Sequence, residues 1–387
     1  MTNNQLKIER IELHHIQMPL AHPFQTSFGR ETERSAILLS VHSEGMIGWA
    51  ECGAGVLPNY DYETVDTAWH ILKDFLAPGL IGHPLAAPGD IFSSAGYRMA
   101  RGHPMAKAAL ENAVWDLLAR AQNVPLQNLL GGQKERVEVG VSIGIQPTLD
   151  KLLERIDSFI QVGYGRIKVK IKPDWDLTPL RAIRKAHPHI KLMADANSAF
   201  TLNDAPLFRE MESLNLLMIE QPLGYDDIFD HSRLQPQLNT PICLDESIHT
   251  PGDARLALHL DACRIINIKV GRVGGFSNAL AIHNICAEAG APVWCGGMLE
   301  TGIGRAANLH LASLPNFTLP GDISATERYF HQDIAEPSFS LNAEDSTISV
   351  PKGPGLGVEV QMDRVEKFRL RQEIIKTNDE RRMTNDE

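Results

Sequence analysis

Between Ile167 and Lys269 the chain repeats one pattern, an apolar run closed by a charged residue: IKVK (167–170), LMAD (192–195), LMIE (217–220), ICLD (242–245) and IINIK (265–269). The closing residues are 25, 25, 25 and 24 positions apart. A strand, a helix and their two loops together occupy roughly 25 residues in a βα unit. The period therefore predicts consecutive βα units in this part of the chain.

Eight apolar runs share this spacing, and a segment long enough for one helix separates each from the next; they cover residues 137–143, 166–171, 191–194, 216–219, 241–244, 264–268, 291–295 and 316–319. Eight such units predict an α/β barrel, a modified (β/α)8 or TIM-like barrel, over residues 131–319. A doubly wound open sheet contains the same units and is the alternative. It is disfavoured because no glycine-rich phosphate loop follows the first strand.

The residues before the barrel follow a different pattern. Residues 6–18 and 35–42 alternate apolar and polar side chains, which predicts half-buried strands, and residues 105–121 carry an apolar stripe at helical spacing. Residues 1–130 are therefore expected to form an α+β capping domain, on which residues 320–368 are expected to pack. Residues 369–387 hold many charges and few apolar side chains, so we expect a disordered tail or a loosely held helix.

Composition excludes several classes of protein. The 387 residues include 37 basic and 48 acidic side chains, a net charge of −11, which argues against a nucleic-acid binder. No run of 18 apolar residues is present, so no membrane span is expected, and the polar start does not resemble a secretory signal. The five cysteines are odd in number and form no CxxC pair, as expected for reduced thiols of a cytoplasmic protein.

Three of the charged residues that close the runs are acids: Asp195, Glu220 and Asp245. The carboxyl ends of barrel strands meet at one mouth, where active sites of this architecture lie. Three carboxylates without histidine or cysteine favour a hard cation, Mg²⁺ with Mn²⁺ as a substitute. A single acid would more often cap a helix or pair with a lysine. Three acids at one period favour a metal site.

Lysines close the runs before and after the acids. Lys168 and Lys170 are two positions apart and share a strand face, so both should point inward, and Lys269 should approach from the opposite side. Nearby positive charge is expected to lower the pKa of Lys170 and make it a base. Lys168 is expected to bind a substrate carboxylate. This set suits removal of a proton next to a carboxylate, with a cation stabilising the resulting charge and no organic cofactor.

These motifs resemble the enolase superfamily, in its muconate-lactonising-enzyme-like subgroup. KVK, ADAN, IEQP, LDES and INIK follow in the order of that family's landmarks, and the resemblance covers nearly the whole chain. It implies that Asp195, Glu220 and Asp245 bind the metal and that Lys170 and Lys269 are the acid/base pair. The seventh strand ends in PVWCGG without a histidine, so a site of the mandelate-racemase type is not expected.

Within the subgroup, FQTSFG (24–29), VGVSIG (139–144), KVGRVGG (269–275) and GGMLETGIGRAAN (296–308) resemble o-succinylbenzoate synthases and N-acylamino acid racemases. The resemblance implies dehydration of a cyclohexadiene carboxylate to 2-succinylbenzoate, on the route to menaquinone, or racemisation of N-acylated amino acids. One protein could do both. A dipeptide epimerase, a lactonising enzyme, a Schiff-base aldolase and a non-catalytic relict barrel are weaker alternatives.

The same resemblance adds pocket residues and lids. The pocket residues expected to contact substrate, besides Lys168, are Asn197, Ser142, Met298 and Ile323. Glu246 and Arg272 are expected to support the residues that do the chemistry, although Arg272 could instead form a surface salt bridge. Residues 21–30 and 51–60 should close over a small carboxylate substrate. The protein is expected to be a homo-oligomer.

Overall fold

A single parallel sheet organises the larger half of the molecule. The computed structural model describes residues 5–26 and 29–376. Seven strands lie in the sheet in their chain order, so each strand pairs with the next one along the chain. They are β7 Val141–Ile143, β8 Arg166–Lys170, β9 Lys191–Asp195, β10 Ile219–Glu220, β11 Ile242–Leu244, β12 Ile265–Ile268 and β13 Val293–Cys295. All their pairings are parallel.

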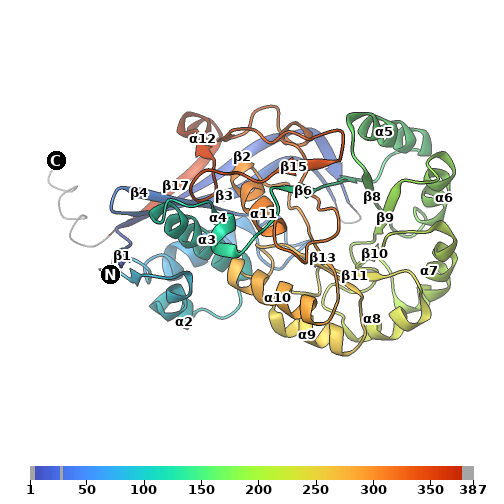
Figure 1. The fold of residues 1–387 in the computed structure, drawn as a ribbon, viewed down its shortest axis with the longest axis horizontal. Helices are drawn as coiled ribbons and strands as arrows, with labels where there is room; N and C mark the ends of the chain where they lie inside the picture. Colours follow the sequence, from blue (N-terminus) through green and yellow to red (C-terminus); the bar gives the residue numbers. More distant parts are fainter. Residues whose placement is uncertain (1–4, 27–28, 377–387) are drawn as a thin grey trace.

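Helices surround this sheet, and Figure 1 shows α5 to α10 as an arc outside the strands. One α-helix follows each strand of the sheet: α5 Leu149–Val162, α6 Leu177–Ala186, α7 Ala205–Met211, α8 Phe229–Leu234, α9 Pro251–His259, α10 Phe276–Glu288 and α11 Gly302–Ala312. Local sequence sets their ends. The side chain of Thr148 accepts a hydrogen bond from Lys151 at the start of α5, and Gly163 ends that helix with a φ of +109°.

An irregular segment closes the ring. Seven of the eight predicted runs contain strands of this sheet, but residues 316–319, all within the described part of the chain, form no strand. Phe317 makes an isolated parallel bridge to Val293, and Gly321 makes another to Val139 beside β7. The segment therefore joins the two edges of the sheet. The predicted barrel is confirmed, and the prediction of a regular eighth strand is wrong.

The capping domain is built on an antiparallel sheet in the order β17, β2, β3, β4. These strands are β2 Arg10–Gln25, β3 Arg30–Ser43, β4 Met46–Cys52 and β17 Arg369–Lys376. The helical elements are α1 Val65–Ile71, continued by the π-helical turn Leu72–Leu76, then α2 Ala95–Met99, α3 Pro104–Ala121 and α4 Leu126–Leu130. The predicted strand at 35–42 falls within β3 and the predicted helix at 105–121 within α3, whereas residues 6–18 are divided between β1 Leu6–Lys7 and the first part of β2.

Strand β17 corrects the expectation for residues 369–387. Residues 369–376 pair antiparallel with β2, from Arg369 opposite Ile16 to Lys376 opposite Arg10. Ile375 is buried, and the guanidinium of Arg371 lies 4.3 Å from the centre of the Trp69 ring. Charged residues can form this strand because their stems pack on the cap while their charges stay hydrated. The rest of the expected tail, 377–387, lies outside the described residues.

The segment after the barrel returns to the cap. Its elements are the 3₁₀ turn Thr326–Arg328, β14 Ala335–Glu336, β15 Thr347–Ser349, β16 Glu359–Val360 and α12 Met362–Phe368. Strand β15 pairs with β6 Arg136–Glu138, and β14 pairs with β16. Two hydrogen bonds hold the segment against the cap: the Leu126 amide donates to the Gly355 carbonyl at 2.7 Å, and the Leu356 amide donates to the side chain of Asp116 in α3 at 2.6 Å.

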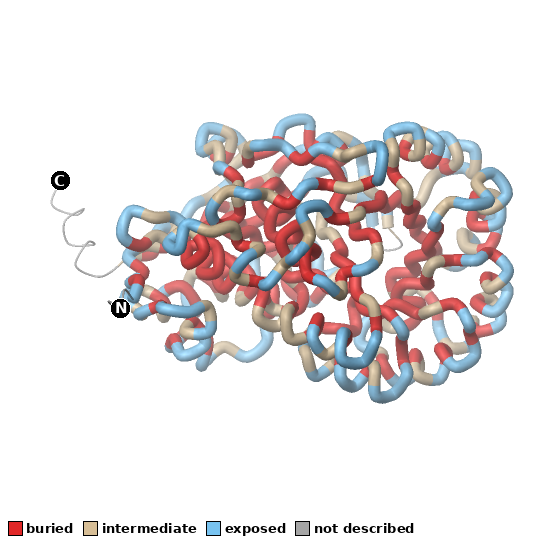
Figure 2. Tube along the Cα trace, in the orientation of Figure 1, coloured by how far each residue is buried: buried red, intermediate tan, exposed pale blue. Residues whose placement is uncertain are grey.

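Burial follows this architecture. Two large hydrophobic clusters fill the molecule, one centred on the barrel and one in the cap between the sheet and helix α3. Figure 2 shows buried segments through the interior and exposed segments along the outer helices and loops. The five cysteines are buried and free. Within the described ranges, no helix combines the length and the apolar character that crossing a membrane requires.

Candidate active site

Strand β8 supplies three inward-facing cations. Arg166, Lys168 and Lys170 alternate along the strand and are all buried. Residues two apart on a strand share a face, so the three side chains form a row inside the barrel. Pairing in register places Lys170 beside Asp195 and Asp195 beside Glu220. The KVK motif predicts that Lys168 and Lys170 lie on the same face of the strand, and this agrees with their placement.

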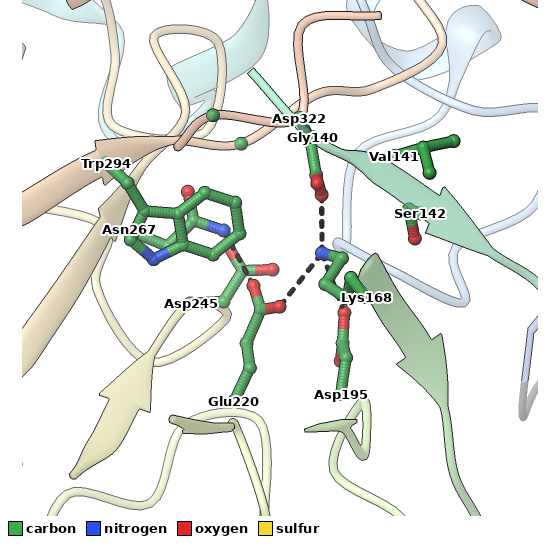
Figure 3. Close-up of polar contacts among 12 residues, drawn as sticks. Gly140, Val141, Ser142, Lys168, Asp195, Glu220, Asp245, Asn267, Trp294 and Asp322 are labelled. Atoms are coloured by element: carbon green, nitrogen blue, oxygen red, sulfur yellow. Dashed lines mark hydrogen bonds and ion pairs between the residues drawn. The ribbon is translucent and has the colours of Figure 1, made fainter. Parts of the chain in front are cut away.

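Lys168 lies at the centre of a network of carboxylates (Figure 3). Its Nζ lies 2.5 Å from Asp322, 2.9 Å from Glu220 and 3.0 Å from Asp195. Burial lowers the pKa of Lys168, but the three carboxylates raise it by more, so the net shift is upward. The sequence interpretation gave this lysine to substrate binding. In this arrangement its ammonium group is engaged by protein acids.

The two lysines expected to act as acid and base line one cavity. The cavity has a volume of about 90 Å³ and also contacts Lys168, Tyr60 and Ser142. The Nζ of Lys170 donates a hydrogen bond of 2.6 Å to Asp195, and that of Lys269 donates one of 2.9 Å to Asp245. These lysines approach from β8 and from the end of β12, with the acidic strands between them.

The three predicted metal ligands are buried but do not form one cluster. Asp195 and Glu220 both contact Lys168, whereas Asp245 pairs with Lys269 and Arg272. Among the described residues, no group of three histidine, cysteine, aspartate or glutamate side chains is arranged to hold a metal ion. Asp195 and Glu220 thus share Lys168 as a partner, whereas Asp245 has different partners.

The chemistry of the three acids nevertheless fits a divalent cation. Burial and the neighbouring Asp195 raise the pKa of Glu220 to about 7, because negative charge is concentrated there. Burial also raises the pKa of Asp195, but Lys170 and Lys168 lower it by more, to well below its ordinary value. Lysine ammonium groups supply the compensating charge in this arrangement. A hard cation among oxygen ligands would do the same, provided that Asp245 turns from Lys269 and Arg272.

The other predicted pocket residues divide into two groups. Ser142, Asn197 and Met298 line the cavity. Ile323 is buried but is not among the residues that line it. Asn197 donates from its side chain to Glu246, at 2.9 Å, and from its backbone to Asp195, at 3.1 Å. Asn197 and Glu246 therefore hold the loop that follows Asp195 at the end of β9.

Arg272 belongs to the interior, so its interpretation as a surface salt bridge is wrong. It is fully buried, its Nη1 pairs with Asp245, and its Nε donates to the carbonyl of Ile248 at 2.9 Å. It also donates to the Asn267 carbonyl at 2.5 Å. Arg272 thus ties the strand that ends in Lys269 to the loop that carries Asp245.

Sequence reasoning missed three residues of the site. Asp322 accepts from Arg166 at 2.7 Å and pairs with Lys168. Asn267 donates to Glu220 at 2.7 Å. Tyr60 reaches Lys269 from the cap. Asn267 shares strand parity with Lys269, which could have indicated it. Asp322 comes from an irregular segment and carries no such signal. Tyr60 falls in the expected lid segment 51–60, but its contact with Lys269 was not predicted.

Both expected lid segments reach the barrel mouth. Phe24 and Thr26 line the cavity together with Tyr60. The Ile145 amide, just after β7, donates to the carbonyl of Gln25 at 2.9 Å. Residues 27–28 of the first lid lie outside the described residues. The described parts of the two segments therefore form the cap side of the cavity.

A buried acid joins the cap to the barrel at helix α11. Glu51 of β4 accepts hydrogen bonds from the Thr301 amide at 3.0 Å, the Thr301 hydroxyl at 2.7 Å and the Gly304 amide at 3.2 Å. These groups lie at the positive N-terminus of the helix. Burial and the nearby Glu300 nevertheless raise the pKa of Glu51 to about 7.

Substitution Glu51→Gln should flatten the pH dependence of stability. Between an ordinary pKa of 4.5 and about 7, the folded protein keeps a proton that the unfolded chain has lost. The free energy of unfolding therefore falls as pH rises through this window, by up to about 3 kcal/mol from this group. Urea unfolding gives the free energy of unfolding of both proteins at pH 5 and pH 8. The value for Glu51→Gln minus that for the wild type should be more positive at pH 8 than at pH 5. An equal difference at the two pH values would contradict the raised pKa of Glu51.

Comparison with known proteins agrees with this fold. The family described as "Mandelate racemase / muconate lactonizing enzyme, N-terminal domain" matches residues 10–131, and "Enolase C-terminal domain-like" matches residues 151–364. An o-succinylbenzoate synthase of Geobacillus stearothermophilus is 51 % identical over 364 residues, 94 % of this chain and 96 % of that protein. An N-succinylamino acid racemase of Thermus thermophilus is 45 % identical over 94 % of this chain and 98 % of that protein.

Solved structures give the same result. An enolase superfamily member from Listeria innocua superposes with a TM-score of 0.92 at 41 % identity, covering 96 % of this chain and all of that one. A capped barrel whose strands end in buried lysines and acids defines the class of enolase-like enzymes. The chain belongs to the enolase superfamily, in its mandelate racemase and muconate lactonising branch. Synthases and lactonising enzymes of this superfamily generally depend on a divalent metal.

Proposed function

We propose that the protein is an o-succinylbenzoate synthase. It would convert 2-succinyl-6-hydroxy-2,4-cyclohexadiene-1-carboxylate into 2-succinylbenzoate and water, a step of menaquinone biosynthesis. The observation that carries the proposal is the pair Lys170 and Lys269, which line one buried cavity on either side of three acids. Relatives named o-succinylbenzoate synthase, at 46 % and 51 % identity over most of the chain, support the choice of substrate.

Asp195, Glu220 and Asp245 would hold Mg²⁺, with Mn²⁺ as a possible substitute, because their oxygens suit a hard cation. When bound, the cation supplies positive charge that stabilises the negative charge developing on the substrate carboxylate. Asn197 and Glu246 keep the loop after β9 in place through the bonds described above. Lys168 would turn toward the substrate carboxylate once a cation shares its present acids.

Lys170 would act as the base in the dehydration. Its neutral amine takes the proton from the carbon that bears the carboxylate, and the electron pair of that bond moves into the carboxylate to give an enediolate. The pair then returns to the ring as the C–O bond to the hydroxyl breaks, and the ammonium of Lys170 gives its proton to the leaving hydroxide. Water departs, the ring becomes aromatic and Lys170 is neutral again. Lys269 would contribute mainly its charge, placed on the opposite side of the substrate. The lids exclude bulk water from this step.

Racemisation of N-succinylamino acids is the second candidate, and one observation favours it. Lys269 is held by Asp245 and lies beside Arg272, so a second amine of defined position faces the cavity opposite Lys170. Racemisation needs a base on each face of the carbon. Relatives named N-succinylamino acid racemase, at 45–46 % identity, fit this second activity. We propose that the protein works in the cytoplasm as a homo-oligomer and that one site serves both reactions.

The test is a comparison of both activities on the purified protein with Mg²⁺. The kcat/KM for the cyclohexadiene substrate is measured by loss of its absorbance, and that for N-succinyl-phenylalanine by polarimetry. We expect the protein to dehydrate the cyclohexadiene substrate whether or not it also racemises N-succinyl-phenylalanine. We expect kcat/KM to be higher for dehydration than for racemisation. Racemisation without dehydration would replace the synthase by the racemase. Absence of both, in protein that also fails to exchange the substrate α-proton, would overturn the proposal.

A further inference from the structure

The capping domain contributes one side chain to the surroundings of Lys269. Tyr60 lies in the loop between β4 and α1, outside the barrel sequence. Its hydroxyl is 2.9 Å from the Nζ of Lys269, 3.1 Å from Asp245 and 3.1 Å from Arg272. The Nζ of Lys269 also lies 4.2 Å from the centre of the Tyr60 ring. A cap residue therefore contacts the lysine through both its ring and its hydroxyl.

These contacts use the full bonding capacity of the phenol. Lys269 and Arg272 donate to the two lone pairs of the oxygen, and the single hydroxyl proton goes to Asp245. A hydroxyl with every position engaged has little freedom to move. The face of the ring attracts the ammonium group as well. Tyr60 thus limits the positions that the long, flexible side chain of Lys269 can take.

The two lysines differ in this respect. Within the described chain, the hydrogen bond found for the Nζ of Lys170 goes to Asp195 of the barrel. Lys269 has a barrel partner, Asp245, and a cap partner, Tyr60. Asp245 is also one of the three acids proposed to bind the cation. Once it is drawn to a cation, Tyr60 becomes the main remaining anchor of Lys269.

We propose that Tyr60 is a positioning residue for Lys269, so that the cap controls one of the two bases and leaves the other unaffected. The proposal rests on the proposed acid/base role of Lys269. In that role the Cα–H bond of an N-succinylamino acid breaks and the neutral amine of Lys269 takes the proton. The electron pair moves into the carboxylate, the lysine exchanges its proton for a solvent deuteron, and the pair returns to form a C–D bond with that deuteron. Loss of the anchor slows proton transfer on this face alone.

The experiment follows exchange of the α-proton in deuterated water for each enantiomer of N-succinyl-phenylalanine. The variant Lys269→Ala identifies the enantiomer that depends on Lys269, because its exchange is lost. In Tyr60→Phe, which keeps the ring, we expect exchange of that enantiomer to fall on the order of 10- to 100-fold. Exchange of the other enantiomer should stay within about threefold. Racemisation should fall with the slower exchange.

Tyr62→Phe is the matched control, since Tyr62 lies two residues away and is half-exposed against His249. It should leave both exchange rates unchanged. An equal fall for both enantiomers in Tyr60→Phe, with a lower melting temperature, would show a purely structural role and overturn the proposal. So would unchanged exchange in that variant. If the wild type exchanged neither enantiomer, the proposed racemisation, and with it the acid/base role of Lys269, would fail instead, which separates the two outcomes.

Discussion

Substitution Lys170→Ala is expected to lower kcat for the dehydration on the order of 10²- to 10⁴-fold, the contribution of a positioned general base. Racemisation should be abolished, because one face of the carbon loses its base. Lys170 lines the cavity and its ammonium group lies 2.6 Å from Asp195. Removing the amine leaves the other lysine on the wrong side of the substrate for this proton. Steady-state rates of both reactions, measured with saturating Mg²⁺, provide the check.

The matched control is Lys172→Ala. Lys172 has the same strand parity as Lys170 but lies beyond the end of β8 and is absent from the lining of the cavity. Its replacement should change either rate by less than about threefold. A Lys170→Ala variant that still racemised would contradict the two-base arrangement. The variant Lys269→Arg keeps the charge and should spare dehydration more than racemisation.

Removal of the metal is expected to have an effect of similar size. Exhaustive chelation should lower both activities by at least about 10³-fold, because charge stabilisation by a bound cation contributes several kcal/mol. Added Mg²⁺ should restore them. Glu220→Gln should resemble chelation, since this wholly buried acid lies between Lys168 and Asn267 at the centre of the acidic strands. Activity and Mg²⁺ binding by calorimetry are the measurements.

Glu138→Gln serves as the control for the metal experiment, because Glu138 pairs with Lys191 at the surface of the sheet. This variant should bind Mg²⁺ as the wild type does. Full activity after chelation, or unchanged Mg²⁺ affinity in Glu220→Gln, would remove these acids from the proposed metal site. The expected binding also implies that Asp245 turns away from Lys269, because these three acids do not form one cluster in this structure.

The barrel could be predicted because its strands obey a local rule. An apolar run ending in one charge marks each of β8 to β12, and two of the helices between them, α6 and α9, begin with side-chain caps from Asp176 and Thr250. The run at 316–319 has the spacing of the others but does not end in a charge, and the chain there pairs through single bridges at Phe317 and, just after the run, at Gly321. Whether this segment forms a strand depends on its register with both of its neighbours in the ring. The composition of the segment alone does not determine that register.

Strand β17 shows the same limit over a longer distance. Its residues are charged and alternate weakly, and their partners on β2 lie more than 350 positions earlier, as in the pair Arg10 and Lys376. The local composition of this strand therefore predicts a disordered tail. The same difference between local and long-range information applies to the site. The acids and lysines at strand ends and the lid segment 51–60 could be predicted, whereas the position of Asp322 and the contact of Tyr60 with Lys269 depend on the whole fold.

The pairing of β17 with β2 also affects how the chain folds during synthesis. The cap is completed by the two ends of the chain, so the barrel is in effect an insertion between its pieces. At about 5–20 residues per second, β2 leaves the ribosome roughly 20–70 s before its partner exists. During that time one edge of the nascent sheet stays open to other chains. The barrel strands pair only with near neighbours and can assemble earlier, so the last step of folding is the closing of the cap.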